Sequence, residues 1–212
     1  MKQGIIFDMD GTLWDSAENV AKSWNEAIRK DGSVKRELTT ADIKGVMGKT
    51  MDVIAQTLFP ELDEAARGEL LEACCQVEND YLREHGGVLY AGVQDTFEKL
   101  RKNYHLYIVS NCQKGYIEAF LDHYGLWDYI EDMECFGNNH LQKGENIRLV
   151  AERNQLDAAV YVGDIQGDYD ASVQAGAGFV HAAYGFGTID ADVPEISAFT
   201  ELTEIDLESA ML

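Results

Sequence analysis

The stretch GIIFDMDGTLWDS near the N-terminus contains two acids in a pattern that can do chemistry. A short apolar run that stops at acids and glycine is typical of a buried strand ending in a loop. Because side chains alternate along an extended chain, Asp8 and Asp10 would project from the same side. Two such carboxylates repel each other unless a cation lies between them, and a hard divalent ion is the simplest candidate. The stretch is equally compatible with a strand followed by a solvated acidic turn.

Polar residues also follow other apolar runs of the chain. Ser110 and Asn111 stand at the tip of one run. Asp164 ends another run, with Asp168 one helical turn later, and Lys143 precedes a helical segment. Ligands of open α/β sheets bind outside the carboxyl ends of the strands, and acids, a hydroxyl and a lysine suit a metal ion with a phosphoryl group. Each residue alone is compatible with an ordinary role such as a helix cap, and their joint arrival at one sheet edge favours a site.

The elements that must position these residues alternate along the chain. The expected strands are Gly4–Phe7, Leu106–Ser110, Met133–Phe136, Ala159–Val162 and Gly178–Ala183. The expected helices that separate the later strands are Val93–Asn103, Gly115–Tyr124, Glu145–Asn154 and Asp168–Ala175. Because the strands are mostly apolar on both faces, the alternation predicts an α/β fold with a Rossmann-like, doubly wound parallel sheet as its core.

The gap between the first two expected strands is far longer than a βα crossover needs. It contains no convincing strand, but Trp24, Ala27 and Ile28 recur at helical spacing, and a long helix is expected over Asp63–Glu84. The simplest account is a small α-helical domain inserted into the core. The expected parts of the chain are core residues 1–15, the inserted helical domain 16–85 and the remaining core 86–212.

The charge of the chain limits its partners. The sequence has 17 basic and 38 acidic residues among 212, which gives a formal net charge of −21. Nucleic acids and anionic membranes both need a basic footprint, so neither is expected as a partner. An anionic ligand must be attracted by local charge or by metal, against the field of the whole protein. No obligate protein partner is evident from the sequence.

The cysteines and the N-terminus indicate a compartment. The four cysteines have no zinc-type or disulfide-framework spacing, and two of them, Cys74 and Cys75, are adjacent within a helical stretch. Buried free thiols in a reducing compartment are therefore expected. The N-terminal apolar run is too short for a signal peptide, and no run approaches transmembrane length. We expect a soluble, cytoplasmic protein.

The ordered set of motifs resembles the haloacid dehalogenase-like hydrolase superfamily, in the branch with an α-helical cap inserted after the first strand. This branch includes phosphoglycolate phosphatases and β-phosphoglucomutases. The matching segments are the D-x-D-G-T motif at residues 8–12, the strand-closing hydroxyl at Ser110, the lysine before a helix at Lys143, and the G-D-x-x-x-D motif at residues 163–168. The resemblance covers nearly the whole chain. It departs at Gly144, where many relatives have proline, and at Ile165, where Ser or Thr is common.

The resemblance implies phosphoryl transfer through an aspartyl-phosphate. Asp8 would be the nucleophile, and Asp10 would protonate the leaving oxygen and then activate water. Ser110, the Asn111 backbone N–H and Lys143 would hold the phosphate oxygens and spread the charge of the transition state. The catalytic residues implied are therefore Asp8, Asp10 and Lys143.

Magnesium is the cofactor that the resemblance implies. The ion would be held by the Asp8 and Asp164 carboxylates and by the backbone carbonyl of Asp10. Asp168 would orient metal-bound water or Lys143, or would bind the metal directly.

Phosphatase activity on a small phosphorylated metabolite is the first expectation, with phosphoglycolate-like and sugar-phosphate substrates both open. A phosphomutase of the β-phosphoglucomutase kind uses the same motifs and is the alternative. A dehalogenase is disfavoured, because it does not need Asp10, and a phosphonoacetaldehyde hydrolase would need a cap lysine for which Lys49 is an unconvincing match. A phospho-accepting receiver domain, the remote alternative, would carry its aspartate on a middle strand and would lack the insertion.

Overall fold

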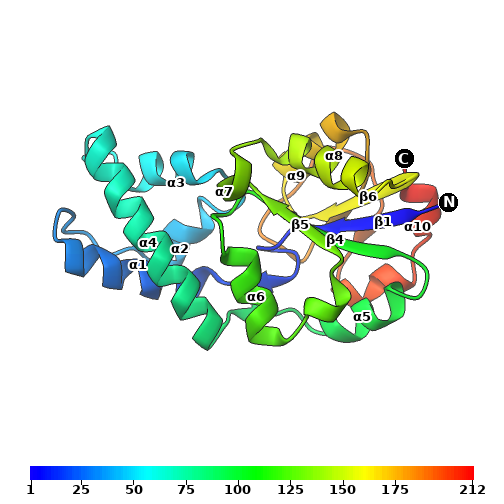
Figure 1. Cartoon of the computed structure of the whole chain (residues 1–212), viewed down its shortest axis with the longest axis horizontal. Coiled ribbons are helices and arrows are strands. Elements are labelled where there is room, and N and C mark those ends of the chain that lie inside the picture. The colour runs from blue at the N-terminus through cyan, green and yellow to red at the C-terminus, as the bar shows by residue number, and fades with distance from the viewer.

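A computed structural model describes all residues of the chain, from Met1 to Leu212. The molecule has two parts side by side, a sheet covered by helices and a separate group of helices at one end (Figure 1). Both chain termini lie at the opposite end of the sheet part from the helical group (Figure 1).

The core is a parallel sheet with strand order β5-β4-β1-β6-β7-β8. Its strands are β1 Gln3–Phe7, β4 His105–Ser110, β5 Asp132–Cys135, β6 Ala158–Gly163, β7 Gly178–Ala182 and β8 Glu195–Ile196. The five expected strands are all present, within a residue or so of their expected bounds, and β8 is an additional short edge strand. The first strand lies in the middle of the sheet because long crossover connections return the chain to both of its sides.

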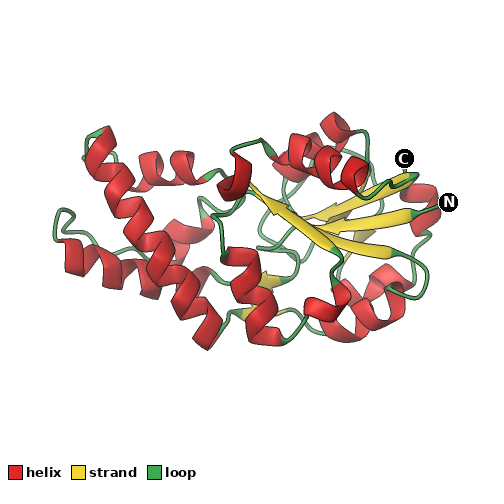
Figure 2. Ribbon diagram, viewed as in Figure 1, coloured by secondary structure: helices red, strands yellow, loops and turns green.

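Helices cover both faces of this sheet (Figure 2). The helices of this part are α5 Val93–Leu100, α6 Tyr116–Tyr124, α7 Phe136–Asn139, α8 Lys143–Arg153, α9 Gln166–Ala175 and α10 Leu207–Ala210, with two 3₁₀ turns at Trp127–Tyr129 and Phe199–Thr203. In β1, Ile5 and Phe7 belong to one apolar cluster and Ile6 to another on the opposite face. Because both faces of the strand are buried, its sequence is apolar throughout. The expected doubly wound α/β core is confirmed.

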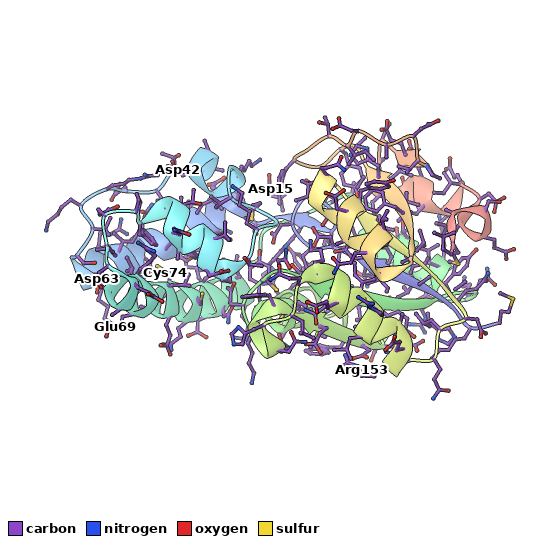
Figure 3. The ribbon with its side chains drawn as sticks, turned by 90° about the horizontal axis from the view of Figure 1, so that it is seen from above. Asp15, Asp42, Asp63, Glu69, Cys74 and Arg153 are labelled. Carbon is purple, nitrogen blue, oxygen red and sulfur yellow. The ribbon has the colours of Figure 1, made fainter.

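The second part of the molecule is the chain between two very short strands, β2 Trp14–Asp15 and β3 Val88–Leu89, which pair antiparallel with each other. It contains α1 Ala17–Asp31, α2 Thr40–Lys44, α3 Met51–Leu58 and α4 Glu64–His85. We call these four helices the helical insertion. Figure 3 shows Asp63, Glu69 and Cys74 on the helical insertion, Arg153 on α8 of the core, and Asp15 between the two parts.

The long helix α4 is the element that docks the helical insertion on the core. Its first turn is capped by Asp63, whose carboxylate accepts the Ala66 backbone N–H at 2.9 Å. Near its end, Asn79 donates to the Lys114 carbonyl at 2.8 Å, and Arg83 pairs with Asp122 of α6 at 2.9 Å. None of the helices is both long enough and apolar enough to cross a membrane.

We expect Phe97→Ala to destabilise the core strongly. The Phe97 ring is fully buried, with ring centroids 5.2 Å from Phe7 and 5.8 Å from Phe199. Removing it leaves a cavity beneath the strand that carries Asp8, so urea denaturation should show a loss of about 3–5 kcal/mol in unfolding free energy. Val173→Ala, at an exposed apolar side chain on α9, is the control and should change stability by less than about 0.5 kcal/mol. A loss below about 1 kcal/mol for Phe97→Ala would contradict the packing described.

Candidate active site

The register of the parallel strands brings the predicted site residues to one edge of the sheet. Phe7, the last residue of β1, lies level with Ile108 of β4 and with Val162 of β6. The chain therefore places Asp8 one residue beyond this level, and Ser110 and Asp164 two residues beyond it. One oxygen each of Asp8, Asp164 and Asp168 lies within 4.8 Å of the others, and all three side chains are buried. The structure thus joins residues from distant parts of the chain.

Lys143 is the cation at the centre of this group. Its Nζ donates to Asp8 Oδ1 at 2.9 Å and to Asp168 Oδ1 at 2.6 Å, and its side chain is only 5% exposed. Burial alone would lower the Lys143 pKa, but the two carboxylates outweigh burial and raise it, so the ammonium stays charged. Lys143 is the first residue of α8. This helix begins two residues earlier than the Glu145 start expected from the sequence, and Gln142 is its N-cap residue.

Backbone donors fix the orientation of the other two acids. Asp168 Oδ2 accepts the backbone N–H groups of Asp164 at 3.0 Å and Ile165 at 3.2 Å, which caps the start of α9. Asp164 Oδ2 accepts the Phe186 N–H at 2.6 Å. A Cβ atom on Gly11 would collide with the Asp164 carboxylate, and Gly11 also has a φ of +88°, so only glycine suits this position.

The crowding of acids changes their ionisation. Burial, with the charge of Asp168, raises the pKa of Asp8 from 3.8 to about 7, although Lys143 opposes the change. Burial and the same Asp168 charge raise the pKa of Asp164 from 3.8 to about 8. One ammonium group thus does not balance three clustered carboxyl groups. An all-oxygen set of donors with surplus negative charge fits a hard divalent cation.

The side chain of Asp10 points away from this cluster. Its Oδ1 accepts hydrogen bonds from Ser16 Oγ at 2.6 Å and from Tyr116 OH at 2.7 Å. Burial raises the Asp10 pKa from 3.8 to about 6, and the two hydroxyl donors partly offset this. Asp10 therefore stands beside the nucleophile candidate with a pKa suited to giving and taking protons near neutral pH. In the metal site that the sequence resemblance implies, Asp10 would bind the ion through its backbone carbonyl.

A cavity of about 40 Å³ lies between the sheet edge and the helical insertion. Asp10, Ser110 and Asn111 line it from the core, and the Asn111 amide donates to the Gly48 carbonyl of the insertion at 2.9 Å. Lys49 also lines it. A volume of this size holds only a few water molecules.

Several residues of the site were not expected from the sequence. Tyr161 places its hydroxyl 3.3 Å from Asp8 Oδ1, and Tyr116 and Ser16 hold Asp10, yet nothing in their spacing pointed to these roles. Glu78 lines the cavity from α4. A signal for Glu78 was present, because this acid lies four residues from both Cys74 and Leu82 on the buried face of its helix.

Comparison with known proteins identifies the family. The haloacid dehalogenase-like hydrolase profile matches residues 5–182, so the chain belongs to this family. The phosphoglycolate phosphatase of Vibrio vulnificus strain YJ016 is 26% identical over 227 residues, covering 97% of this chain and 96% of its own. That of Rhodobacter capsulatus is 26% identical over 215 residues, covering 97% and 95%. The resemblance seen in the sequence motifs is confirmed.

Solved structures share the fold. The crystal structure of a predicted phosphoglycolate phosphatase from Haemophilus somnus has a TM-score of 0.81 at 20% identity and covers 96% of this chain and 97% of its own. That of a β-phosphoglucomutase from Clostridium difficile has a TM-score of 0.75 at 15% identity and covers 99% and 95%. Enzymes with different names thus share this arrangement of core and insertion.

We expect the metal-free protein to lose stability as the pH rises. Because the pKa values of Asp8 and Asp164 rise on folding from 3.8 to about 7 and about 8, the folded chain binds more protons than the unfolded chain between these values. Its melting temperature in EDTA should therefore fall by about 4 °C or more between about pH 5 and about pH 9. Asp164→Asn, which takes up no proton, should make this fall smaller.

The control for this measurement is Asp170→Asn, at an exposed acid on α9 that accepts the Gln166 amide at 2.9 Å. It should leave the pH dependence of the wild-type protein intact. A melting temperature that rises with pH, or an Asp164→Asn variant with the wild-type slope, would show that the clustered acids are ionised without strain in the folded protein.

Proposed function

We propose that this hydrolase is a magnesium-dependent phosphatase that acts on a small phosphorylated metabolite through an aspartyl-phosphate intermediate. The observation that carries the proposal is the pairing of a buried Asp8 with Lys143, at a sheet edge where Asp10 faces a cavity. The phosphoglycolate phosphatases among the relatives support the same reaction class.

Asp8 is the nucleophile of the proposed reaction. Its carboxylate oxygen attacks phosphorus, the ester oxygen leaves, and the phosphoryl group becomes bound to Asp8. The Lys143 ammonium, 2.9 Å from Asp8, places a positive charge where the phosphoryl oxygens must lie. Ser110 and the Asn111 backbone N–H complete the phosphate site, because both lie at the end of β4 beside this pair.

Asp10 moves the protons of the proposed reaction. Protonated Asp10 donates to the leaving oxygen, and the resulting carboxylate then takes a proton from the water that hydrolyses the aspartyl-phosphate. The hydroxyl groups of Ser16 and Tyr116 hold the Asp10 side chain on the cavity side of the chain. Its pKa of about 6 allows both protonation states near neutral pH.

Magnesium is the proposed cofactor, held by the Asp8 and Asp164 carboxylates and the backbone carbonyl of Asp10. Asp168 pairs with Lys143 at 2.6 Å and would support the ion through this contact or bind it directly. The ion supplies positive charge that offsets repulsion between the phosphate and the clustered acids.

The helical insertion serves as the cap of the proposed enzyme. We assign residues 1–15 and 86–212 to the core and residues 16–85 to the cap, which excludes bulk water from the cavity when it closes. With about 40 Å³ of space in the closed arrangement, a phosphate ester needs the cap to open for entry. A phosphomutase would need a second phosphate site, whereas Lys49 is the only cationic side chain that lines the cavity. This favours the phosphatase.

The roles of the first two acids can be separated by trapping the intermediate. Asp8→Asn should lose essentially all turnover, because an amide cannot form the acyl-phosphate. Asp10→Asn should still become phosphorylated on Asp8 by p-nitrophenyl phosphate, whose leaving group needs little protonation. Breakdown of that intermediate should slow by roughly 10²–10⁴-fold. Mass spectrometry after rapid quenching locates the phosphate, and phosphate on another residue would refute the mechanism.

The metal requirement is tested by removing and restoring the ion. Hydrolysis of p-nitrophenyl phosphate should fall below about 1% of its initial rate in EDTA, because the acids then repel the incoming phosphate. Excess magnesium chloride should restore the rate, and calcium chloride, with its larger and more flexible coordination shell, should not. Undiminished hydrolysis by a preparation shown to be free of metal would contradict the assignment.

A further inference from the structure

The cavity beneath the cap has two chemically different ends. Asp10 and Ser110 form the core end, where the phosphoryl group reacts in the proposed function. The cap end is formed largely by apolar side chains, among them Trp24, Val46 and Ile54, and by one acid, Glu78. A group of the substrate that lies at the cap end must therefore match a largely apolar wall whose one acid is Glu78, with Gln113 and Lys49 also lining the cavity.

Glu78 is buried at this end without a cationic partner. It is 3% exposed, and no ion pair of the structure includes it, whereas charged side chains in protein interiors are nearly always paired. The Trp24 indole N–H donates to its Oε2. Burial raises the Glu78 pKa from 4.5 to about 8, and a ligand cation beside the carboxyl group would favour its charged form.

One other polar side chain of the cavity wall has an oxygen without a partner in the protein. Asn111 Oδ1 is buried with no hydrogen-bond partner, because the amide nitrogen of this side chain is used on the Gly48 carbonyl. Glu78 is thus the carboxyl group that the cavity offers at its cap end, and Gln113 also lines the wall. An unused buried acceptor costs about 1–3 kcal/mol, and a ligand that donates a hydrogen bond to it recovers this cost.

The cationic side chains of the cap do not offset these acceptors. Lys22 pairs with Glu18 at 2.7 Å on the exposed face of α1, and Lys44 pairs with Asp15 at 2.6 Å. Lys49 lines the cavity, but its side chain is exposed to solvent. A substrate carboxylate at the cap end would lie in an apolar space next to an acid, with no buried cation to compensate its lost hydration.

We propose that Glu78 is a specificity-determining residue, which selects phosphate esters whose far end carries a hydrogen-bond donor, a hydroxyl or an ammonium group, and rejects those that end in a carboxylate. The inference rests on the proposed phosphatase function and deepens it. It predicts that this chain does not prefer phosphoglycolate, the compound in the name of its phosphoglycolate phosphatase relatives. Hydroxyl and ammonium groups both donate to a carboxyl oxygen, and an ammonium group would additionally supply the missing positive charge.

The test compares four phosphate esters that share a two-carbon chain and differ only at the far end. They are 2-hydroxyethyl phosphate, O-phosphoethanolamine, 2-phosphoglycolate and ethyl phosphate, each measured with magnesium for kcat/KM by phosphate release. We expect the better of the two donor esters to exceed 2-phosphoglycolate by about tenfold or more, since unpaired polar groups discriminate strongly in buried sites.

Substitutions at Glu78 assign this preference to the residue. In Glu78→Leu, kcat/KM for the preferred donor ester relative to ethyl phosphate should fall about tenfold or more. Glu78→Gln keeps the side-chain volume and an oxygen that accepts from Trp24, so it tests the proposal even if the leucine variant misfolds. It should retain the preference for a hydroxyl and lose a preference for an ammonium group. Glu72→Gln, the same change on an exposed part of α4, is the matched control and should leave all four values unchanged.

The outcomes separate the two proposals. If the enzyme hydrolyses p-nitrophenyl phosphate but 2-phosphoglycolate is the best of the four esters, the inference alone is overturned. The same holds if the better donor ester exceeds 2-phosphoglycolate in kcat/KM by less than about tenfold. Equal losses for all four esters in both Glu78 variants also overturn it, because they would mark a purely structural residue. No hydrolysis of any ester, p-nitrophenyl phosphate included, would overturn the proposed function and this inference with it.

Discussion

The constraint on which the rest of this structure depends is the concentration of negative charge at one edge of the sheet. Asp8, Asp164 and Asp168 are buried within 4.8 Å of one another in a chain that is already strongly acidic. Water is excluded from them, so each charge is stabilised only by the protein or by a ligand. Lys143 contributes one positive charge, and the two backbone N–H groups that Asp168 accepts contribute dipoles. The unbalanced negative charge that remains fits a divalent cation, as proposed above.

The parallel sheet is the device that holds these charges in place. Its strands are buried on both faces, and backbone hydrogen bonds set their register, so the residues after each strand end cannot move apart independently. Lys143 and Asp168 belong to the first turns of α8 and α9, where helix capping orients the side chains. Asp8 and Asp164 lie in the first positions of the loops that follow β1 and β6, so rigid elements directly beside them hold the site in place.

The helical insertion gives the site a second side. It is tied to the core through α4 and α6 and through the Asn111–Gly48 hydrogen bond, and it closes a largely apolar cavity over Asp10. The core supplies the clustered acids and Lys143. The helical insertion supplies Trp24 and Glu78, which line the cavity on the side opposite the clustered acids. In the proposed enzyme, reaction type and substrate choice would therefore be carried by different parts of the chain.

The amino-acid sequence by itself determined the sheet, the insertion and the motif residues. Strands buried on both faces must be apolar throughout, and acids or hydroxyls directly after them must meet at one edge, so both could be predicted from local patterns. Helix α4 could also be predicted from a local pattern, because its apolar residues recur at helical spacing. Only the tertiary structure decided that Tyr116 and Ser16 hold Asp10, and that Glu78 reaches the cavity. These contacts depend on how the insertion docks against α6, which is set by packing between segments far apart in sequence. The helical spacing of Glu78 could mark it as buried, but not show which surface it would face.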